Sequence, residues 1–197
     1  MYKRQQQIRT VGQQANAQHK PLVIDPVAVG AVQYRKQVAT GLLADFHPDV
    51  IRGNAGEIAA LADISWQAKG IDAGEGAGDL VAIAQACAQK LDCVVILSGP
   101  TDIITDGTRV VKVLNGTPLF QVHVGSGDML SSIVAAFCAV TPDTFEAAQT
   151  ACLVFAAIGQ RVVQAVPDVG AGSFTVHLLD ALQSTTVAQI EAVAAYE

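Results

Sequence analysis

The sequence has 197 residues, of which 51% are hydrophobic and 15% are charged, and its formal net charge is −6. This composition excludes a disordered chain and indicates a well-buried core, which we expect to form one domain over residues 1–197. The negative net charge argues against a nucleic-acid scaffold.

No apolar stretch reaches the length of a membrane span, and residues 1–20 lack the apolar segment of a secretory signal. The four cysteines show no CxxC spacing and lie in apolar helix or strand patterns: Cys87, Cys93, Cys138 and Cys152. This usage is typical of small buried side chains in a reducing compartment. We therefore expect a cytoplasmic protein.

The first half of the chain alternates short apolar runs with segments of helical periodicity. Residues 21–25 predict a buried strand, and residues 34–46 predict a helix that ends before Pro48. The elements expected after it are a strand over 49–52, a helix over 54–62, a glycine-rich turn over 70–78, a helix over 79–91 and a strand over 93–98.

The second half begins with two β-branched runs around Asp106 and Gly107, which predict a hairpin over 102–114. The segment LFQVHV, residues 119–124, predicts a further strand. Helices are then expected over 127–140, 144–165, 173–183 and 185–195. This order predicts an α/β fold with a mostly parallel sheet, in which ligands bind at the carboxyl ends of the strands.

Four predicted strand ends carry polar residues or glycines: Asp25; then Arg52, Asn54 and Glu57; then Ser98 and Gly99; and finally Gly125, Ser126, Gly127 and Asp128. Each group also has a local interpretation. Asp25 and the Ser98–Gly99 pair could form turns, Asn54 with Glu57 fits a capping box, and Asp128 could favour a helix dipole. The glycines lack the third member of the dinucleotide-binding fingerprint.

The combination is more specific than its parts. Asp25 and Glu57 are carboxylates able to hold hydrated magnesium, and Arg52 is a guanidinium for phosphate. Glycines at a helix start let an anion approach the backbone N–H groups. Asp128 could then take the proton of an acceptor hydroxyl. These parts together predict phosphoryl transfer, which depends on positioning and on stabilising charge.

Six motifs in this order resemble those of the hydroxyethylthiazole kinase family: VIDPVAVGAVQYR, VIRGNAGEIAAL, AKGID, SGPTDIITDG, VGSGDMLSS and GAGSF. The resemblance runs from about residue 14 to about residue 182. It implies a ribokinase-like three-layer α/β/α fold, a role in thiamine biosynthesis and salvage, and a homotrimer with thiazole sites near subunit interfaces.

The resemblance also implies roles for the strand-end residues. Arg52 and Ser98 would contact ATP, with Asn54 beside them, and Asp25 and Glu57 would lie near Mg²⁺, largely through water. Gly125 would touch the thiazole alcohol and form an anion hole with Ser126 and Gly127. Asp128 would be the catalytic base.

The sequence departs from the family pattern in two places. Most thiazole kinases carry cysteine where Asp128 stands, whereas sugar kinases of the superfamily carry aspartate. Family members also have strands and helices before the strand predicted at 21–25, which supply part of the thiazole pocket. We therefore expect an N-terminally shortened fold without its first strands.

Three other functions compete with a thiazole kinase. A pyrimidine kinase of the superfamily is disfavoured because RGN stands where a TPN-type stretch is usual. A nicotinamide-hydrate dehydratase is disfavoured by VIDPVAVGA. A non-catalytic remnant that binds nucleotide only remains open. Among other residues, His123 is expected to be a strand residue and not a catalyst, and Ser173 to cap the helix that follows it.

Overall fold

The computed structural model describes residues 4–66 and 79–197. Within these ranges five strands form one sheet in the order β1 (Val23–Ile24), β2 (Val50–Asn54), β3 (Val94–Ser98), β4 (Asp102–Thr105) and β5 (Val110–Val113). The first three strands are parallel, and β4 is antiparallel to both of its neighbours. Four of the five strands therefore run in the same direction, which confirms the mostly parallel sheet.

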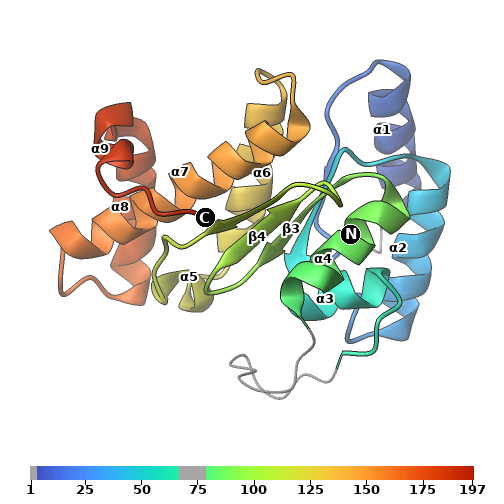
Figure 1. Cartoon of the computed structure of the whole chain (residues 1–197), viewed down its shortest axis with the longest axis horizontal. Coiled ribbons are helices and arrows are strands. Elements are labelled where there is room, and N and C mark those ends of the chain that lie inside the picture. The colour runs from blue at the N-terminus through green and yellow to red at the C-terminus, as the bar shows by residue number, and fades with distance from the viewer. Residues whose placement is uncertain (1–3, 67–78) are drawn as a thin grey trace.

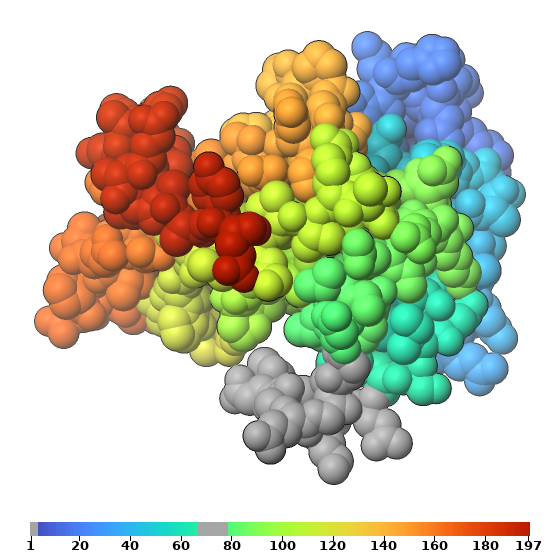
Figure 2. Space-filling view, in the orientation of Figure 1, coloured from blue at the N-terminus to red at the C-terminus, as the bar shows by residue number. Residues whose placement is uncertain are grey.

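Helices flank this sheet in the described part of the chain (Figure 1): α1 (Gln5–Ala17), α2 (Gln33–Asp45), α3 (Ala55–Leu61), α4 (Leu80–Leu91), α5 (Leu119–Val122), α6 (Ser126–Cys138), α7 (Thr144–Ala165), α8 (Ala171–Ser184) and α9 (Val187–Glu191). The N-terminal helices α1 and α2 lie at one end of the molecule and the C-terminal helices α8 and α9 at the other (Figures 1 and 2). The glycine-rich turn predicted at 70–78 lies outside the described residues.

Successive strand residues point to opposite faces of the sheet, and helices cover both faces. Val50 and Ile96 belong to a core shared with α6, α7 and α8, whereas Ile51 and Leu97 belong to a second core shared with α2, α3 and α4. The continuous apolar runs in β2 and β3 are explained by this double burial. The predicted three-layer α/β/α arrangement is therefore confirmed.

The helix starts follow local capping chemistry. The Asp79 carboxylate accepts a hydrogen bond from Val81 N–H at the start of α4, and the Asp143 carboxylate accepts hydrogen bonds from the first-turn amides of α7. At α8 the N-cap is Gly170, so the prediction that Ser173 caps this helix is wrong; Ser173 lies within the first turn, where its hydroxyl contacts the backbone of Gly170. The helix begins at Ala171, two residues earlier than predicted.

The strand predicted over 119–124 is wrong. Residues Leu119–Val122 form the short helix α5, and Phe120 packs against Phe155 and Phe174 on the helical layer. A further strand has no place beside β5, because backbone atoms of Lys112 and Glu197 pair there at 2.8 and 3.0 Å. The helix predicted over 185–195 ends early for the same reason, since the chain after α9 turns back to join this edge.

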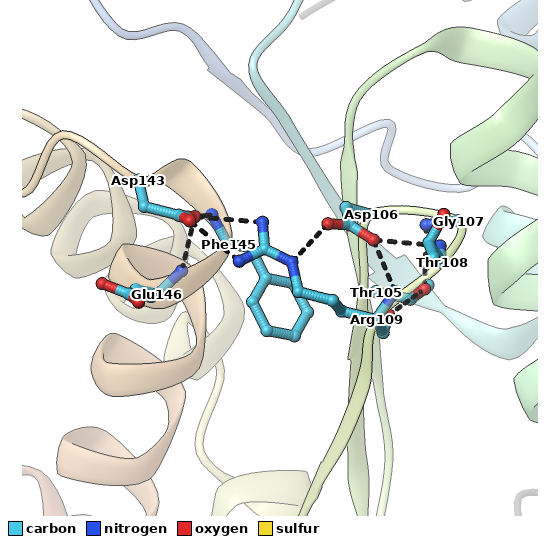
Figure 3. Close-up of polar contacts among 8 residues, drawn as sticks. All are labelled: Thr105, Asp106, Gly107, Thr108, Arg109, Asp143, Phe145 and Glu146. Carbon is cyan, nitrogen blue, oxygen red and sulfur yellow. Dashed lines mark hydrogen bonds and ion pairs between the residues drawn. The ribbon is translucent and has the colours of Figure 1, made fainter.

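The β4–β5 turn is tied to α7 through Arg109 (Figure 3). Its guanidinium donates to both carboxylate oxygens of Asp143, at 2.8 and 3.2 Å, and its Nε donates to Asp106. The same guanidinium lies 4.3 Å from the centre of the Phe145 ring. Asp106 also accepts hydrogen bonds from the amides of Thr108 and Arg109, which confirms its predicted role in the turn.

None of the helices in the described ranges combines the length and apolar character that crossing a membrane would require.

Candidate active site

Arg52 connects the carboxyl ends of three strands. It lies in β2, and its Nε donates a hydrogen bond to Ser98 Oγ at the end of β3, at 2.8 Å. Its Nη1 lies 3.1 Å from Oδ2 of Asp25, the residue that follows β1. Both side chains of this ion pair are largely withdrawn from solvent. Three of the predicted site residues are therefore in direct contact.

Gly127 brings the N-terminus of α6 against the same guanidinium. A Cβ built on Gly127 would overlap Arg52 Nη1, so the arginine occupies space that any other residue here would take. Gly125 is the N-cap of α6, with a φ of 100° that favours glycine. The helix N-terminus and the guanidinium together concentrate positive charge, which favours binding of an anion.

Ser126 and Asp128 differ in how they are held. The Ser126 hydroxyl donates to Phe120 O at 2.8 Å, so it is already used to fix the loop to α5. Asp128 lies in the first turn of α6 and is exposed. Among the residues that the structure describes, none donates a hydrogen bond to its carboxylate. Asp128 is therefore free to accept a proton or a hydrogen bond from a ligand.

Asn54 and Glu57 form the predicted capping box at the start of α3. Asn54 Oδ1 accepts from Glu57 N–H at 3.0 Å, and Glu57 Oε2 accepts from Asn54 N–H at 2.8 Å. Oε1 of the buried Glu57 also accepts from Ala28 N–H at 2.6 Å. Ala28 has a φ of 60°, so this contact supports a left-handed backbone beside Asp25. Glu57 thus joins the loop after β1 to α3.

Asp25 lies among charges of both signs. Burial raises the pKa of its carboxyl, the Arg52 guanidinium opposes this, and the negative charges of Glu57 and Asp128 add to the increase. Ser131 Oγ, one turn after Asp128 on α6, donates to Asp25 Oδ2 at 3.4 Å. Three carboxylates and one guanidinium therefore share the same electrostatic environment.

The turn after β3 is held by Asp102, whose Oδ1 accepts from Gly99 N–H at 3.0 Å. The predicted turn at Ser98 and Gly99 is thereby confirmed. Burial raises the pKa of Asp102 to about 6, against the lowering effects of this hydrogen bond and of Arg52.

Within residues 4–66 and 79–197, no group of three or more His, Cys, Asp or Glu side chains is close enough to hold a metal ion. Asp25 and Glu57 nevertheless suit magnesium, which commonly keeps several waters and binds one or two carboxylates together with substrate phosphates. The donor set therefore fits a hydrated ion better than a protein cage.

A polar cluster at the strand ends, beside a glycine-rich helix start, is found in many phosphate-binding proteins, so the sequence relationships decide the family. The model of the hydroxyethylthiazole kinase family matches residues 1–188. The chain belongs to the hydroxyethylthiazole kinase family.

Individual relatives agree with this family. A hydroxyethylthiazole kinase of Lactiplantibacillus plantarum is 65% identical over 189 residues, which cover 95% of this chain and 72% of the relative. The solved hydroxyethylthiazole kinase of Pyrococcus horikoshii has a TM-score of 0.85 at 28% identity, over 98% of this chain and 71% of that chain. An ADP complex of Bacillus subtilis pyridoxal kinase has a TM-score of 0.59 at 21% identity, over 81% and 61%, and supports the ribokinase-like fold alone.

Several polar contacts in this family member have only weak signals in the sequence. Ser131 stands three residues after Asp128 and therefore on the same side of α6, which is a spacing that could have revealed it. The hydrogen bond from Ala28 to Glu57 and that from Ser126 to Phe120 involve backbone atoms, so residue types give no signal for them. His123 does not lie in a strand but ends α5.

Proposed function

We propose that this protein transfers the γ-phosphoryl group of ATP to the primary alcohol of 4-methyl-5-(2-hydroxyethyl)thiazole. The observation that supports this most directly is the contact of Arg52 with Ser98, Asp25 and the Gly127 backbone at the start of α6. Membership of the hydroxyethylthiazole kinase family supports the choice of acceptor.

In this proposal the phosphates lie between Arg52 and the N-terminus of α6. The first-turn amides of a helix have no acceptor within that helix, and they point at an anion placed there. Arg52 adds a full charge and a planar set of donors that suits phosphate oxygens. Ser98, which accepts a hydrogen bond from Arg52, would keep the guanidinium oriented and also contact the nucleotide, with Asn54 beside it in the adjacent strand.

Asp128 would act as the general base. The substrate hydroxyl oxygen attacks the γ-phosphorus, the bond to the β–γ bridging oxygen breaks, and the hydroxyl proton passes to the Asp128 carboxylate. Gly125 would lie beside the alcohol, and the amides that follow it would stabilise the charge on the transferred group. Asp128 is exposed and accepts no side-chain hydrogen bond from residues 4–66 and 79–197, which suits this role.

Asp25 and Glu57 would hold hydrated Mg²⁺, with water between the carboxylates and the ion. Bound magnesium supplies charge neutralisation for the phosphate oxygens. The protein's part would be to orient Asp25, because Arg52 and Ser131 both donate to its Oδ2, and the Arg52 guanidinium also opposes the increase in its pKa that burial causes. Glu57 is fixed by its two backbone contacts and adds negative charge beside Asp25.

We also infer a homotrimer in a reducing, cytoplasmic setting. Val27, Val32 and Tyr34 follow Asp25 and are 45%, 43% and 57% exposed, so a subunit contact beside the site would cover apolar surface. The four cysteines are free, and burial raises the pKa of Cys87 and Cys93 to about 12, as expected for unreactive thiols. Light scattering of the purified protein would test the trimer.

The function is tested by incubating the protein with ATP, Mg²⁺ and the thiazole alcohol and measuring ADP release. We expect release that depends on the thiazole and yields its monophosphate. Equal release with a pyrimidine alcohol would reassign the protein to the pyrimidine kinases. Nucleotide binding without release with either alcohol would identify a non-catalytic remnant.

A further inference from the structure

His123 makes a hydrogen bond that joins the start of the site to α8. It ends α5, and its Nδ1 lies 2.9 Å from Oγ1 of Thr175. The ring also meets the fully buried Phe174 edge to face, at 6.3 Å between centres. The residue that caps the C-terminus of α5 is therefore fixed to α8 by both a polar and an aromatic contact.

The glycine loop at the start of α6, residues 125–127, depends on α5 for its position. Ser126 N–H donates to His123 O at 3.4 Å, and Ser126 Oγ donates to Phe120 O at 2.8 Å. Gly125 lies between these contacts with a φ of 100°. A rotation of α5 would therefore move the loop, and with it the amides that face the proposed phosphate site.

α5 cannot hold this position alone, because it has four residues and so short a helix is unstable by itself. Phe120 anchors it by stacking on Phe155 at 4.8 Å and by an edge-to-face contact with Phe174 at 5.5 Å, but these contacts hold its second residue and not its C-terminal end. Val122 and Val124 are 59% and 95% exposed and add little packing. The His123–Thr175 hydrogen bond is a directional contact that fixes the C-terminal end of α5.

His123 is also costly as a purely structural residue. Its Nε2 is buried and has no hydrogen-bond partner among the described residues. A buried polar nitrogen without a partner destabilises a folded protein, and an apolar ring in this place would avoid that cost. Stability alone therefore does not account for an imidazole between α5 and α8.

We propose that His123 is a positioning residue for phosphoryl transfer, which acts by holding α5, and through it the 125–127 loop, to Thr175 of α8. This inference rests on the proposed kinase function. A displacement of about 1 Å at a reacting group can cost about 100-fold in rate, so a loose loop should lower turnover without unfolding the protein.

The test compares two substitutions at one position. Thr175→Val keeps the shape and loses the hydroxyl, whereas Thr175→Ser keeps the hydroxyl. We expect kcat to fall about tenfold or more in Thr175→Val and to stay within about twofold of the wild type in Thr175→Ser. The melting temperatures of both variants should lie well above the assay temperature. An unchanged kcat in Thr175→Val, or equal losses in both variants, would overturn the proposal.

A double-mutant cycle adds a second criterion. His123→Phe keeps an aromatic ring but removes both nitrogens, and adding Thr175→Val to it should cause no further loss of kcat. Amide hydrogen exchange provides a readout that does not need activity. Exchange over residues 119–129 should be faster in Thr175→Val than in Thr175→Ser, and equal exchange would contradict the role of His123. An inactive wild type would refute the kinase function, while the exchange comparison would still decide the role of His123.

Discussion

The Arg52 guanidinium lies where the side chain of residue 127 would stand, so that Gly127 and Arg52 fit together only because residue 127 has no Cβ. This contact places the guanidinium directly at the N-terminus of α6. Arg52 can therefore keep this position only while residue 127 is glycine.

Gly127→Ala should displace Arg52 and weaken ATP binding by about tenfold, the value of one lost charge-assisted contact. Calorimetric titration with ATP measures the effect. Gly41→Ala in α2 is the control, because a Cβ there meets no atom of the described residues within 4 Å. That variant should bind ATP normally and be slightly more stable, since alanine favours a helix over glycine by up to about 1 kcal/mol. Normal ATP binding by Gly127→Ala would show that Arg52 is not a phosphate contact.

Asp128→Asn should lower kcat by about 10²- to 10⁴-fold while leaving nucleotide affinity intact, because the amide cannot take the proton of the alcohol. Steady-state assays and ATP titration separate the two effects. Asp180→Asn, at an exposed position in α8, is the matched control and should have normal kcat. If Asp128→Asn retained the wild-type rate, the Asp128 carboxylate would not be the base, and its role would be to interact with the dipole at the start of α6.

Ser131→Ala should raise the Mg²⁺ concentration needed for half-maximal rate by about threefold, because Asp25 loses one of its two side-chain donors through a long, weak hydrogen bond. Magnesium titrations at saturating ATP would measure it. Ser132→Ala changes the neighbouring hydroxyl, which is exposed and donates to Asp128 O within its own helix. We expect no shift in that control, and an equal shift in both variants would assign the effect to the helix rather than to Asp25.

Asp102→Asn should alter the pH dependence of stability. The pKa of Asp102 rises from 3.8 to about 6 on folding, so the folded state binds more protons than the unfolded state between about pH 4 and pH 6. Wild-type stability therefore falls over that range as pH increases, whereas an amide can accept from Gly99 N–H without ionising.

Asp102→Asn should increase the free energy of unfolding by about 1 kcal/mol at pH 7.5 and by almost nothing at pH 4. The increase at pH 7.5 is smaller than the free energy that corresponds to the whole pKa change, because the side chain is only partly buried and water screens its charge. Urea denaturation at these two pH values would measure it. An equal change in stability at both would show that the carboxyl does not titrate differently in the folded state.

Arg109→Lys should lower the melting temperature by a few degrees and leave kcat unchanged. Lysine cannot reproduce the forked contact with Asp143 or the stacking on Phe145 (Figure 3). The β4–β5 turn also lies beside the start of β3, at the end of the sheet opposite the candidate site. Arg161→Lys, in which the guanidinium donates to Gln189 O at 3.4 Å in the wild type, is the control for scanning calorimetry. A loss of kcat in Arg109→Lys would contradict this separation from the site.

Local patterns determined much of this protein. The apolar runs of β2 and β3 identify strands buried on both faces, and the spacing from Asn54 to Glu57 predicts the capping box found at α3. The order of strand ends also predicts that Asp25, Arg52 and Ser98 meet at one edge of the sheet. These features follow from the sequence because each depends on short-range periodicity or on the common direction of parallel strands.

Only the tertiary structure decided the conformation of residues 119–124 and the long-range contacts around the site. LFQVHV has the residues of a strand, but the edge of β5 is already paired with Glu197, so the segment folds as α5 and packs Phe120 on the helical layer. The contacts of Gly127 with Arg52 and of His123 with Thr175 join residues 75 and 52 positions apart, and no local pattern encodes them. Such contacts depend on how whole elements pack, because long-range geometry is fixed by the competition among elements for the same surfaces.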